Sequence, residues 1–202
     1  MGHPLPSTSW EDMIFAFLHD PPDKALDIKG HEGRARLYLE AATSSVVDRR
    51  QIKMMADVDA AIAERLPMPT AGSEGERAVG PDYAGLLIHH PLSAASISIS
   101  APSIDKDAVC DCIREIVEGL DRPRDVFLAL WRLLPEKLAG IDPAYWLMPA
   151  DTRVPDHTIW HHLDVTAAFK ATENGGGTAF LSFSLGPVQE FIAAAKSVQD
   201  LW

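Results

Sequence analysis

The sequence predicts a mainly α-helical protein whose final segment changes to an α+β pattern. Apolar residues recur at three- and four-residue spacing along most of the 202 residues, as they do on the buried face of a helix. Residues 173–177, Glu-Asn-Gly-Gly-Gly, interrupt this pattern. Residues 178–184 then alternate as in a β-strand, and residues 188–202 return to helical spacing. A strand and a helix cannot bury themselves alone, so we expect a second domain that begins near residue 178 and continues beyond Trp202.

The expected helices have recognisable start and stop signals. The first covers residues 10–18 with Ser9 as its N-cap, and Pro21-Pro22 ends it, because proline lacks an amide hydrogen and restricts the residue before it. Pro135, Pro143 and Pro149 predict a loop, and residues 92–102 fit either a short strand or an extended loop. Further helices are expected over residues 34–65 with a break near 43–45, over 105–120, over 124–134, and from Pro155-Asp156 to Lys170.

Composition and charge narrow the class of protein. A net charge of −11 argues against a broad basic face for nucleic acid, although an enzyme can still meet nucleic acid at a metal ion. The sequence has no run of 18 apolar residues and no signal-peptide pattern at its N-terminus. Cys110 and Cys112 are too close together for good disulfide geometry. We therefore expect a cytoplasmic protein without a membrane partner.

The pair His19-Asp20 is the first candidate site. It follows the apolar residues of the first expected helix, which would anchor it against the core. Neutral imidazole and carboxylate are the commonest non-sulfur ligands of divalent metals, whereas the alternative is a surface histidine beside a turn aspartate. Asp57 lies near the apolar side of its expected helix, where a carboxylate is unfavourable unless it is paired or metal-bound. It also fits a boundary position that reaches solvent.

A second dense group of such residues lies about 140 residues later, in Asp151–Thr166. If residues 155–170 are one helix, His157 and His161 are four residues apart and share a face, and His157 and Asp164 are two turns apart on the same side. Three imidazoles and two carboxylates within nine residues make a poor core helix. The sequence is compatible with a metal-binding helix and with a solvent-facing helix that Asp156 caps.

Five motifs carry a resemblance to a known family and together span almost the whole chain. They are His19-Asp20-Pro21-Pro22-Asp23-Lys24 with Gly30-His31-Glu32, Ala56-Asp57, His90-Pro91-Leu92-Ser93, Pro149–Asp164 and Ser184–Trp202. These motifs are similar to those of the large subunit of type III-B CRISPR effector complexes, the Cmr type. The pattern after Asp57 is less regular than is usual in that family.

The resemblance implies a permuted HD-type helical domain over residues 1–172, a glycine-rich linker at 173–177 and the first strand and helix of a truncated ferredoxin-like palm domain at 178–202. It implies a metal-dependent nuclease that cleaves single-stranded DNA. His19 and Asp20 would be the central ligands, with Lys24 either at a phosphate oxygen or as a cap of the first helix. The further expected ligands are Asp57, His157, His162 and Asp164. His31 and His90 are candidates for a supporting shell or for loop positions. Ligands without thiolate favour Mn²⁺, Ni²⁺, Co²⁺, Fe²⁺ or Mg²⁺ over structural zinc.

The same resemblance implies partners: other subunits of a type III-B complex, CRISPR RNA, and target RNA that activates the nuclease. The palm domains of the family make cyclic oligoadenylates from ATP with a Gly-Gly-Asp-Asp motif. That motif is absent from these 202 residues, so ATP chemistry is expected only of a longer parent chain. Two other functions fit the sequence: a catalytically inactive module that docks the large subunit onto its partners, and an HD phosphohydrolase that acts on small nucleotides.

Overall fold

The computed structural model describes residues 9–44, 55–64, 82–89, 93–152, 155, 157–173, 179 and 181–182. These residues form mainly helices, which confirms the predicted fold class. The elements are α1 Trp10–Leu18, the 3₁₀ turn η1 Lys24–Leu26, α2 His31–Thr43, α3 Met55–Glu64, β1 Gly85–His89, β2 Ser96–Ser100, α4 Lys106–Val117, α5 Pro123–Ile141, the 3₁₀ turn η3 Pro143–Leu147 and α6 Ile159–Thr172.

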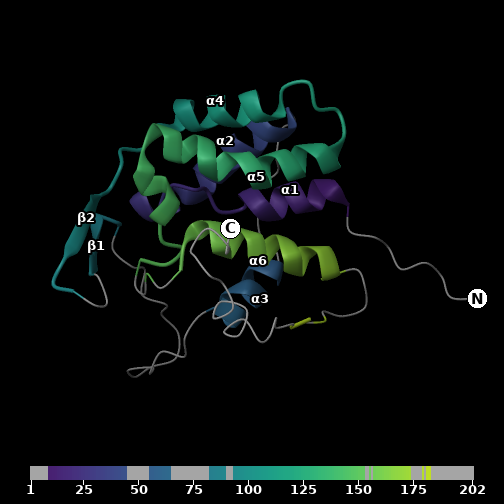
Figure 1. The fold of residues 1–202 in the computed structure, drawn as a ribbon. Coiled ribbons are helices and arrows are strands. Elements are labelled where there is room, and N and C mark those ends of the chain that lie inside the picture. Colours follow the sequence, from purple (N-terminus) through teal and green to yellow (C-terminus); the bar gives the residue numbers. More distant parts are fainter. Residues whose placement is uncertain are drawn as a thin grey trace, which may run out of the picture.

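Helix α1 is central to the helical body (Figure 1). It contacts α2, α5 and α6, while α4 packs on α2 and α5, and α3 packs on the far helix, α6. The core between these helices is built from large apolar side chains that are fully buried, which include Phe17, Leu18, Leu39, Ile113, Leu130, Leu134, Leu138, Met148, Ile159 and Leu163. One end of α1 therefore lies between elements that are distant in sequence, and that end carries His19.

Local sequence signals explain where α1 begins and ends. Ser9 accepts a hydrogen bond from the Asp12 amide through its hydroxyl, and Asp12 accepts one from the Ser9 amide, so the two form a capping box. Phe17 and Leu18 are buried in the last turn. His19 follows as the C-cap residue, before Pro21-Pro22, as the sequence predicts.

The predicted loop at Pro135 is wrong, because α5 continues through this residue to Ile141. Proline inside a helix removes one backbone hydrogen bond and destabilises by about 3 kcal/mol. Leu134 and Leu138 on either side of it are both fully buried. The helix continues because the burial of these side chains against α4, α1 and η3 offsets the lost hydrogen bond.

The start of the last helix also differs from the prediction. Helix α6 begins at Ile159 and not at Pro155-Asp156, and the Thr158 hydroxyl caps it by accepting from the His161 amide at 3.3 Å. The backbone before Thr158 pairs with residues near Met148 instead. Ala150 donates to the His157 carbonyl at 3.2 Å, and Ile159 donates to the Met148 carbonyl at 2.8 Å. His157 therefore precedes the helix.

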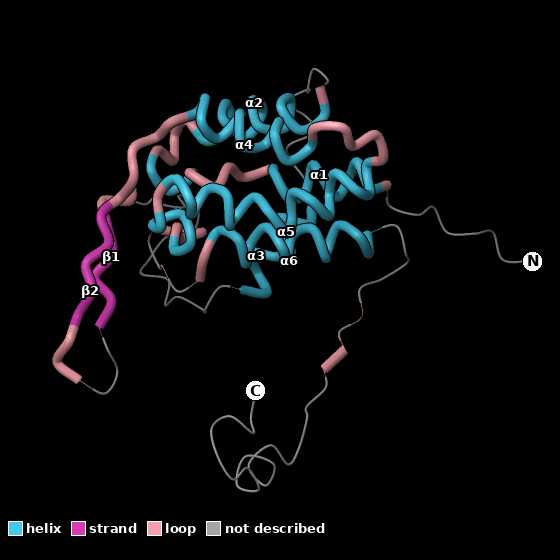
Figure 2. The backbone as a smooth tube through the Cα atoms, turned by 45° about the horizontal axis from the view of Figure 1, so that its top comes forward, coloured by secondary structure: helices cyan, strands magenta, loops and turns pink. Residues whose placement is uncertain are grey.

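Residues 85–100 contain the short β structure of the described chain. Strands β1 and β2 form an antiparallel hairpin in which Leu87 lies opposite Ser98. The hairpin stands beside the helical body (Figure 2) and resolves the open choice between strand and loop in favour of a strand over Ser96–Ser100. The expected palm segment at 178–202 lies outside the described residues except for 179, 181 and 182, so the domain division remains a prediction. Within the described ranges, no helix is both long and apolar enough to span a membrane.

Candidate metal centre

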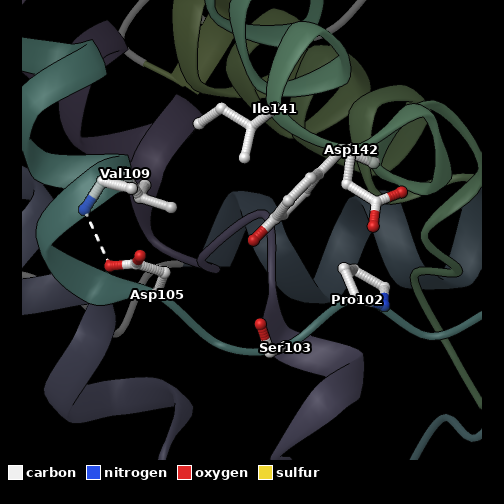
Figure 3. Close-up of a pocket in the computed structure, with 8 residues that line it drawn as sticks. Pro102, Ser103, Asp105, Val109, Ile141 and Asp142 are labelled. Atoms are coloured by element: carbon white, nitrogen blue, oxygen red, sulfur yellow. Dashed lines mark hydrogen bonds between the residues drawn. The ribbon is translucent and has the colours of Figure 1, made fainter.

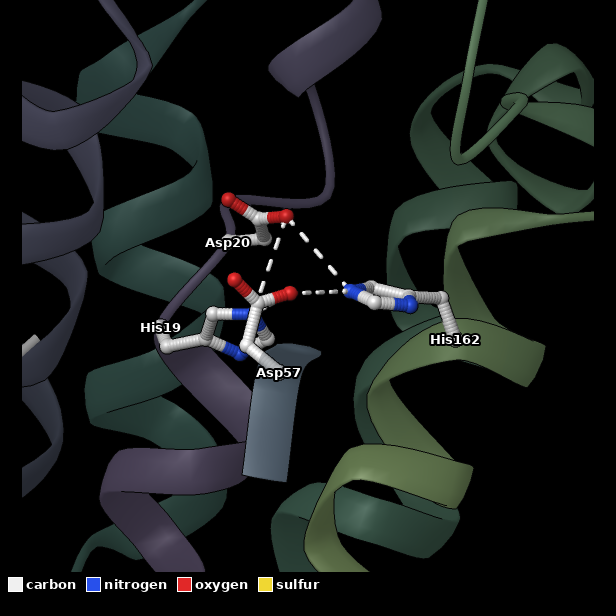
Figure 4. Close-up of side chains that lie close together, drawn as sticks. All are labelled: His19, Asp20, Asp57 and His162. Atoms are coloured by element: carbon white, nitrogen blue, oxygen red, sulfur yellow. Dashed lines mark ion pairs between the residues drawn. The ribbon is translucent and has the colours of Figure 1, made fainter. Parts of the chain in front are cut away.

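Four predicted ligands converge at one point, although they come from three separate parts of the chain. His19 and Asp20 follow the end of α1, Asp57 lies in the first turn of α3, and His162 lies in α6 (Figure 4). One ligand atom from each of the four lies within 4.8 Å of all the others. The Asp57 Oδ1 atom is 3.3 Å from His162 Nε2 and 3.4 Å from His19 Nε2.

The hydrogen bonding of His19 leaves one of its ring nitrogens directed at this cluster. Nδ1 lies 2.7 Å from the Ala16 carbonyl oxygen, which can only accept, so Nδ1 carries the proton. Nε2 is then the atom with the lone pair. It is buried and has no hydrogen-bond partner among the described residues. A buried imidazole whose second nitrogen is held by a carbonyl is the usual arrangement of a metal-binding histidine.

Asp20 is a buried carboxylate with a lysine and two imidazoles close to it. Lys24 donates directly to Asp20 Oδ2, while His19 and His162 each place Nε2 at 3.7 Å from the same oxygen. Burial alone would raise the pKa of Asp20, but Lys24 and His19 outweigh it and hold that pKa below its usual value. Asp20 is therefore ionised and can act as a ligand. His31 Nε2 lies 3.8 Å from Asp20 Oδ1, which places this residue beside the cluster.

Asp57 is the most accessible of the four ligands. Its side chain is 43% exposed, whereas the His19 and His162 side chains are 4% and 6% exposed. Its partial burial would raise the pKa of Asp57, but the close imidazoles of His162 and His19 outweigh burial and hold that pKa well below its usual value. Asp57 therefore reaches solvent at the boundary of α3, which is one of the two alternatives that the sequence left open. It also faces the other three ligands.

A buried polar network supports the loop that carries Asp20 and Lys24, and sequence reasoning did not identify it. Arg34 of α2 donates to Asp23 Oδ1 at 2.8 Å and to Asp27 Oδ2 at 2.8 Å, and the Tyr38 hydroxyl donates to Asp23 Oδ2 at 2.7 Å. Asp23, Arg34 and Tyr38 are all buried. The available signal was the position of Arg34 in α2, four residues before Tyr38 and so on the same face of the helix.

The structure does not bring His157 and Asp164 into the group of four. Asp164 is exposed on the outer side of α6 and accepts a hydrogen bond from the Trp131 indole at 2.8 Å. His157 stacks edge-to-face on His161, with ring centroids 5.9 Å apart. The metal-binding role expected of His157 and Asp164 gains no support from this geometry. His90 lies outside the described residues.

A hollow of the surface lies between the start of α4 and the end of α5 (Figure 3), and it contains none of the predicted site residues. Two carboxylates line it, and each has a structural role. Asp105 caps α4 by accepting from the Ala108 amide, and Asp142 caps η3 by accepting from the Ala144 amide.

Two imidazoles and two carboxylates without a thiolate form a donor set that fits a divalent ion such as Mn²⁺, Ni²⁺ or Co²⁺. The unpartnered Nε2 of His19 supports this fit, because a buried ring nitrogen without a partner is unfavourable. The cluster is therefore a possible divalent-metal site, and its geometry alone leaves the identity of the metal open.

Comparison with known proteins finds curated proteins that are similar to the chain. No protein-family model and no solved structure matches it. The chain is 25% identical over 245 aligned residues to the CRISPR system Cmr subunit Cmr2 of Pyrococcus furiosus, and the match covers 95% of this chain and 27% of that protein. It is 26% identical over 215 residues to the Cmr2 subunit of Saccharolobus solfataricus, which covers 94% of this chain and 20% of that protein. The chain thus spans about a quarter of the length of these relatives. The chain is therefore similar to Cmr2 subunits along nearly its whole length, which agrees with the resemblance of its motifs.

Proposed function

We propose that this chain is an HD-type, metal-dependent nuclease region that hydrolyses phosphodiester bonds of single-stranded DNA. The observation that carries the proposal is the convergence of His19, Asp20, Asp57 and His162 within 4.8 Å. The similarity to Cmr2 subunits over 95% of the chain supports the same function. A divalent ion bound there supplies an acidic water and positive charge for the phosphoryl oxygens.

Each side chain of the cluster would have a separate role in binding the ion or the substrate. His19 and His162 would bind the ion through Nε2, and Asp20 and Asp57 would bind it through carboxylate oxygens. Lys24 is a catalytic candidate because its ammonium group lies at the ligand Asp20, where it can also meet a phosphate oxygen of the substrate. Its contact with Asp20 makes a cap of α1 the less favoured of its two expected roles.

We also propose that the chain acts within a larger complex. As a region of a Cmr2-type subunit, the chain would assemble with other subunits of a type III-B complex in the cytoplasm. Target RNA paired with the CRISPR RNA would activate it. ATP-dependent synthesis of cyclic oligoadenylates would belong to palm domains beyond residue 202.

A docking function without catalysis is the second candidate, and one observation favours it. The β1–β2 hairpin exposes Leu87 by 54% and Ile97 by 66%. Leu87 lies opposite Ser98, and Ile97 is adjacent to Ser98 in β2, so the two side chains are on opposite faces of the hairpin. A hairpin with an exposed apolar side chain on each face is compatible with contact to a partner subunit. This candidate predicts binding to complex subunits without nuclease activity.

The experiment that separates the two functions is a cleavage assay. The purified chain is incubated with a labelled single-stranded oligonucleotide and Mn²⁺, beside the double variant His19→Ala/Asp20→Ala. We expect cleavage by the wild type and none by the variant, because the variant lacks two of the four ligands. Equal cleavage by both proteins, or none by either, would reject the nuclease function.

A further inference from the structure

We propose that Glu173 positions the metal ligand Asp57 by fixing helix α3 to helix α6. This inference rests on the proposed metal site and assigns a role to a residue outside the ligand set. The ligands are held unequally. The side chains of His19, Asp20 and His162 are 4%, 6% and 6% exposed, whereas the Asp57 side chain is 43% exposed. Asp57 therefore depends more than the others on the placement of its own helix.

The described side chains of α3 that are buried against the rest of the protein are small. Ala56 and Ala60 are fully buried, and since they are four residues apart they lie on one face of the helix. Val58 and Ile62 are 40% and 73% exposed, so they contribute less to the packing. Two alanines bury little apolar area. The apolar side chains described in residues 56–63 thus hold α3 weakly, which increases the importance of a polar contact.

Glu173 provides such a contact across 117 residues of sequence. Its Oε1 atom accepts a hydrogen bond from the Ala56 amide at 3.0 Å. Its Oε2 atom accepts from Lys170 Nζ at 2.5 Å, which fixes the orientation of the carboxylate. The Ala56 amide belongs to the first turn of α3, where amides have no acceptor inside the helix. The residue after Ala56 is the ligand Asp57.

The two residues that contact the start of α3, His162 and Glu173, lie on the same side of α6. His162 and Glu173 are eleven residues apart, about three helical turns, and Glu173 keeps helical dihedral angles as the C-cap residue. Helix α3 is thus held at two points, where Asp57 meets His162 and where Ala56 meets Glu173. Without the second point, α3 can shift and withdraw the Asp57 carboxylate from the other three ligands.

The test measures the Mn²⁺ affinity of the 202-residue chain by electron paramagnetic resonance, well below the unfolding temperature of every variant. Glu173→Ala removes the acceptor, and we expect about tenfold weaker binding, as for other residues that support metal ligands. Glu173→Gln keeps an acceptor oxygen for Ala56 and is expected to bind Mn²⁺ about as well as the wild type. The matched control is Glu136→Ala, which removes the same charge from the exposed surface of α5, where Glu136 pairs with Arg132.

Unchanged affinity in Glu173→Ala would overturn the proposal. Equal losses in Glu173→Ala and Glu173→Gln would also overturn it, because the effect would then follow the charge and not the hydrogen bond. Failure of the wild type to bind Mn²⁺ is a separate result, which would reject the metal site itself.

Discussion

Replacing His162 by alanine is expected to weaken Mn²⁺ binding by more than about 100-fold, whereas replacing its neighbour His161 leaves the affinity unchanged. The lower bound follows because loss of a residue that only supports a ligand already weakens binding by about 10–100-fold, and His162 is itself a proposed ligand. His162 is buried with Nε2 3.3 Å from Asp57, while His161 is exposed and stacks on His157. Isothermal titration of the chain with Mn²⁺ measures both variants.

His161→Ala is a close control, because it removes the same chemical group one position away in the same helix. Similar losses in both variants would mean that the histidines of α6 act through general charge and not through one defined site. A loss confined to His161→Ala would place the metal on the outer side of α6, near Asp164, and would contradict the proposed ligand set.

Replacing Asp23 by alanine is expected to lower the free energy of unfolding by ~3–5 kcal/mol, the range seen when one partner of a buried ion pair is removed. Arg34 is only 4% exposed and would lose its contact with Asp23 Oδ1, and the Tyr38 hydroxyl would lose its acceptor. Asp27 remains as a partner of Arg34, but its side chain is 44% exposed and the pair is partly open to solvent. Urea unfolding followed by circular dichroism measures the change.

Asp111→Ala is the control for Asp23→Ala. Asp111 also pairs with an arginine, Arg114, at 2.8 Å, but both side chains are mostly exposed. Exposed pairs contribute about 0–1 kcal/mol, so this variant should unfold close to the wild type. A loss in Asp23→Ala as small as that in Asp111→Ala would show that the buried network does not hold the loop beneath Asp20.

Local signals were sufficient to predict most helices, and tertiary packing explains the exceptions. Ser9 and the Pro21-Pro22 pair mark the bounds of α1 because capping and proline act on the nearest turn. Pro135 does not end α5, because Leu134 and Leu138 are buried against neighbouring helices, and this burial cannot be read from the proline itself. His157 lies outside α6 because its backbone pairs with Ala150, a contact made by the path of the preceding loop.

The position of two of the four clustered ligands, His19 and Asp20, could be predicted from residue types and spacing. His19-Asp20 follows a buried helix end, and that position was predictable from the sequence. The spacing in α6 also held a signal against Asp164, since residues 162 and 164 are two apart and point to different sides of a helix. The support from Asp23, Arg34 and Glu173 was not predictable, because each of these contacts joins segments whose approach depends on the folded chain.

The most direct test of the metal site is a crystal structure of the chain grown with Mn²⁺ and measured for anomalous scattering at the manganese absorption edge. We expect an anomalous peak between His19 Nε2, His162 Nε2 and the carboxylates of Asp20 and Asp57. A well-ordered cluster without such a peak, or a peak beside His157 and Asp164 instead, would contradict the account.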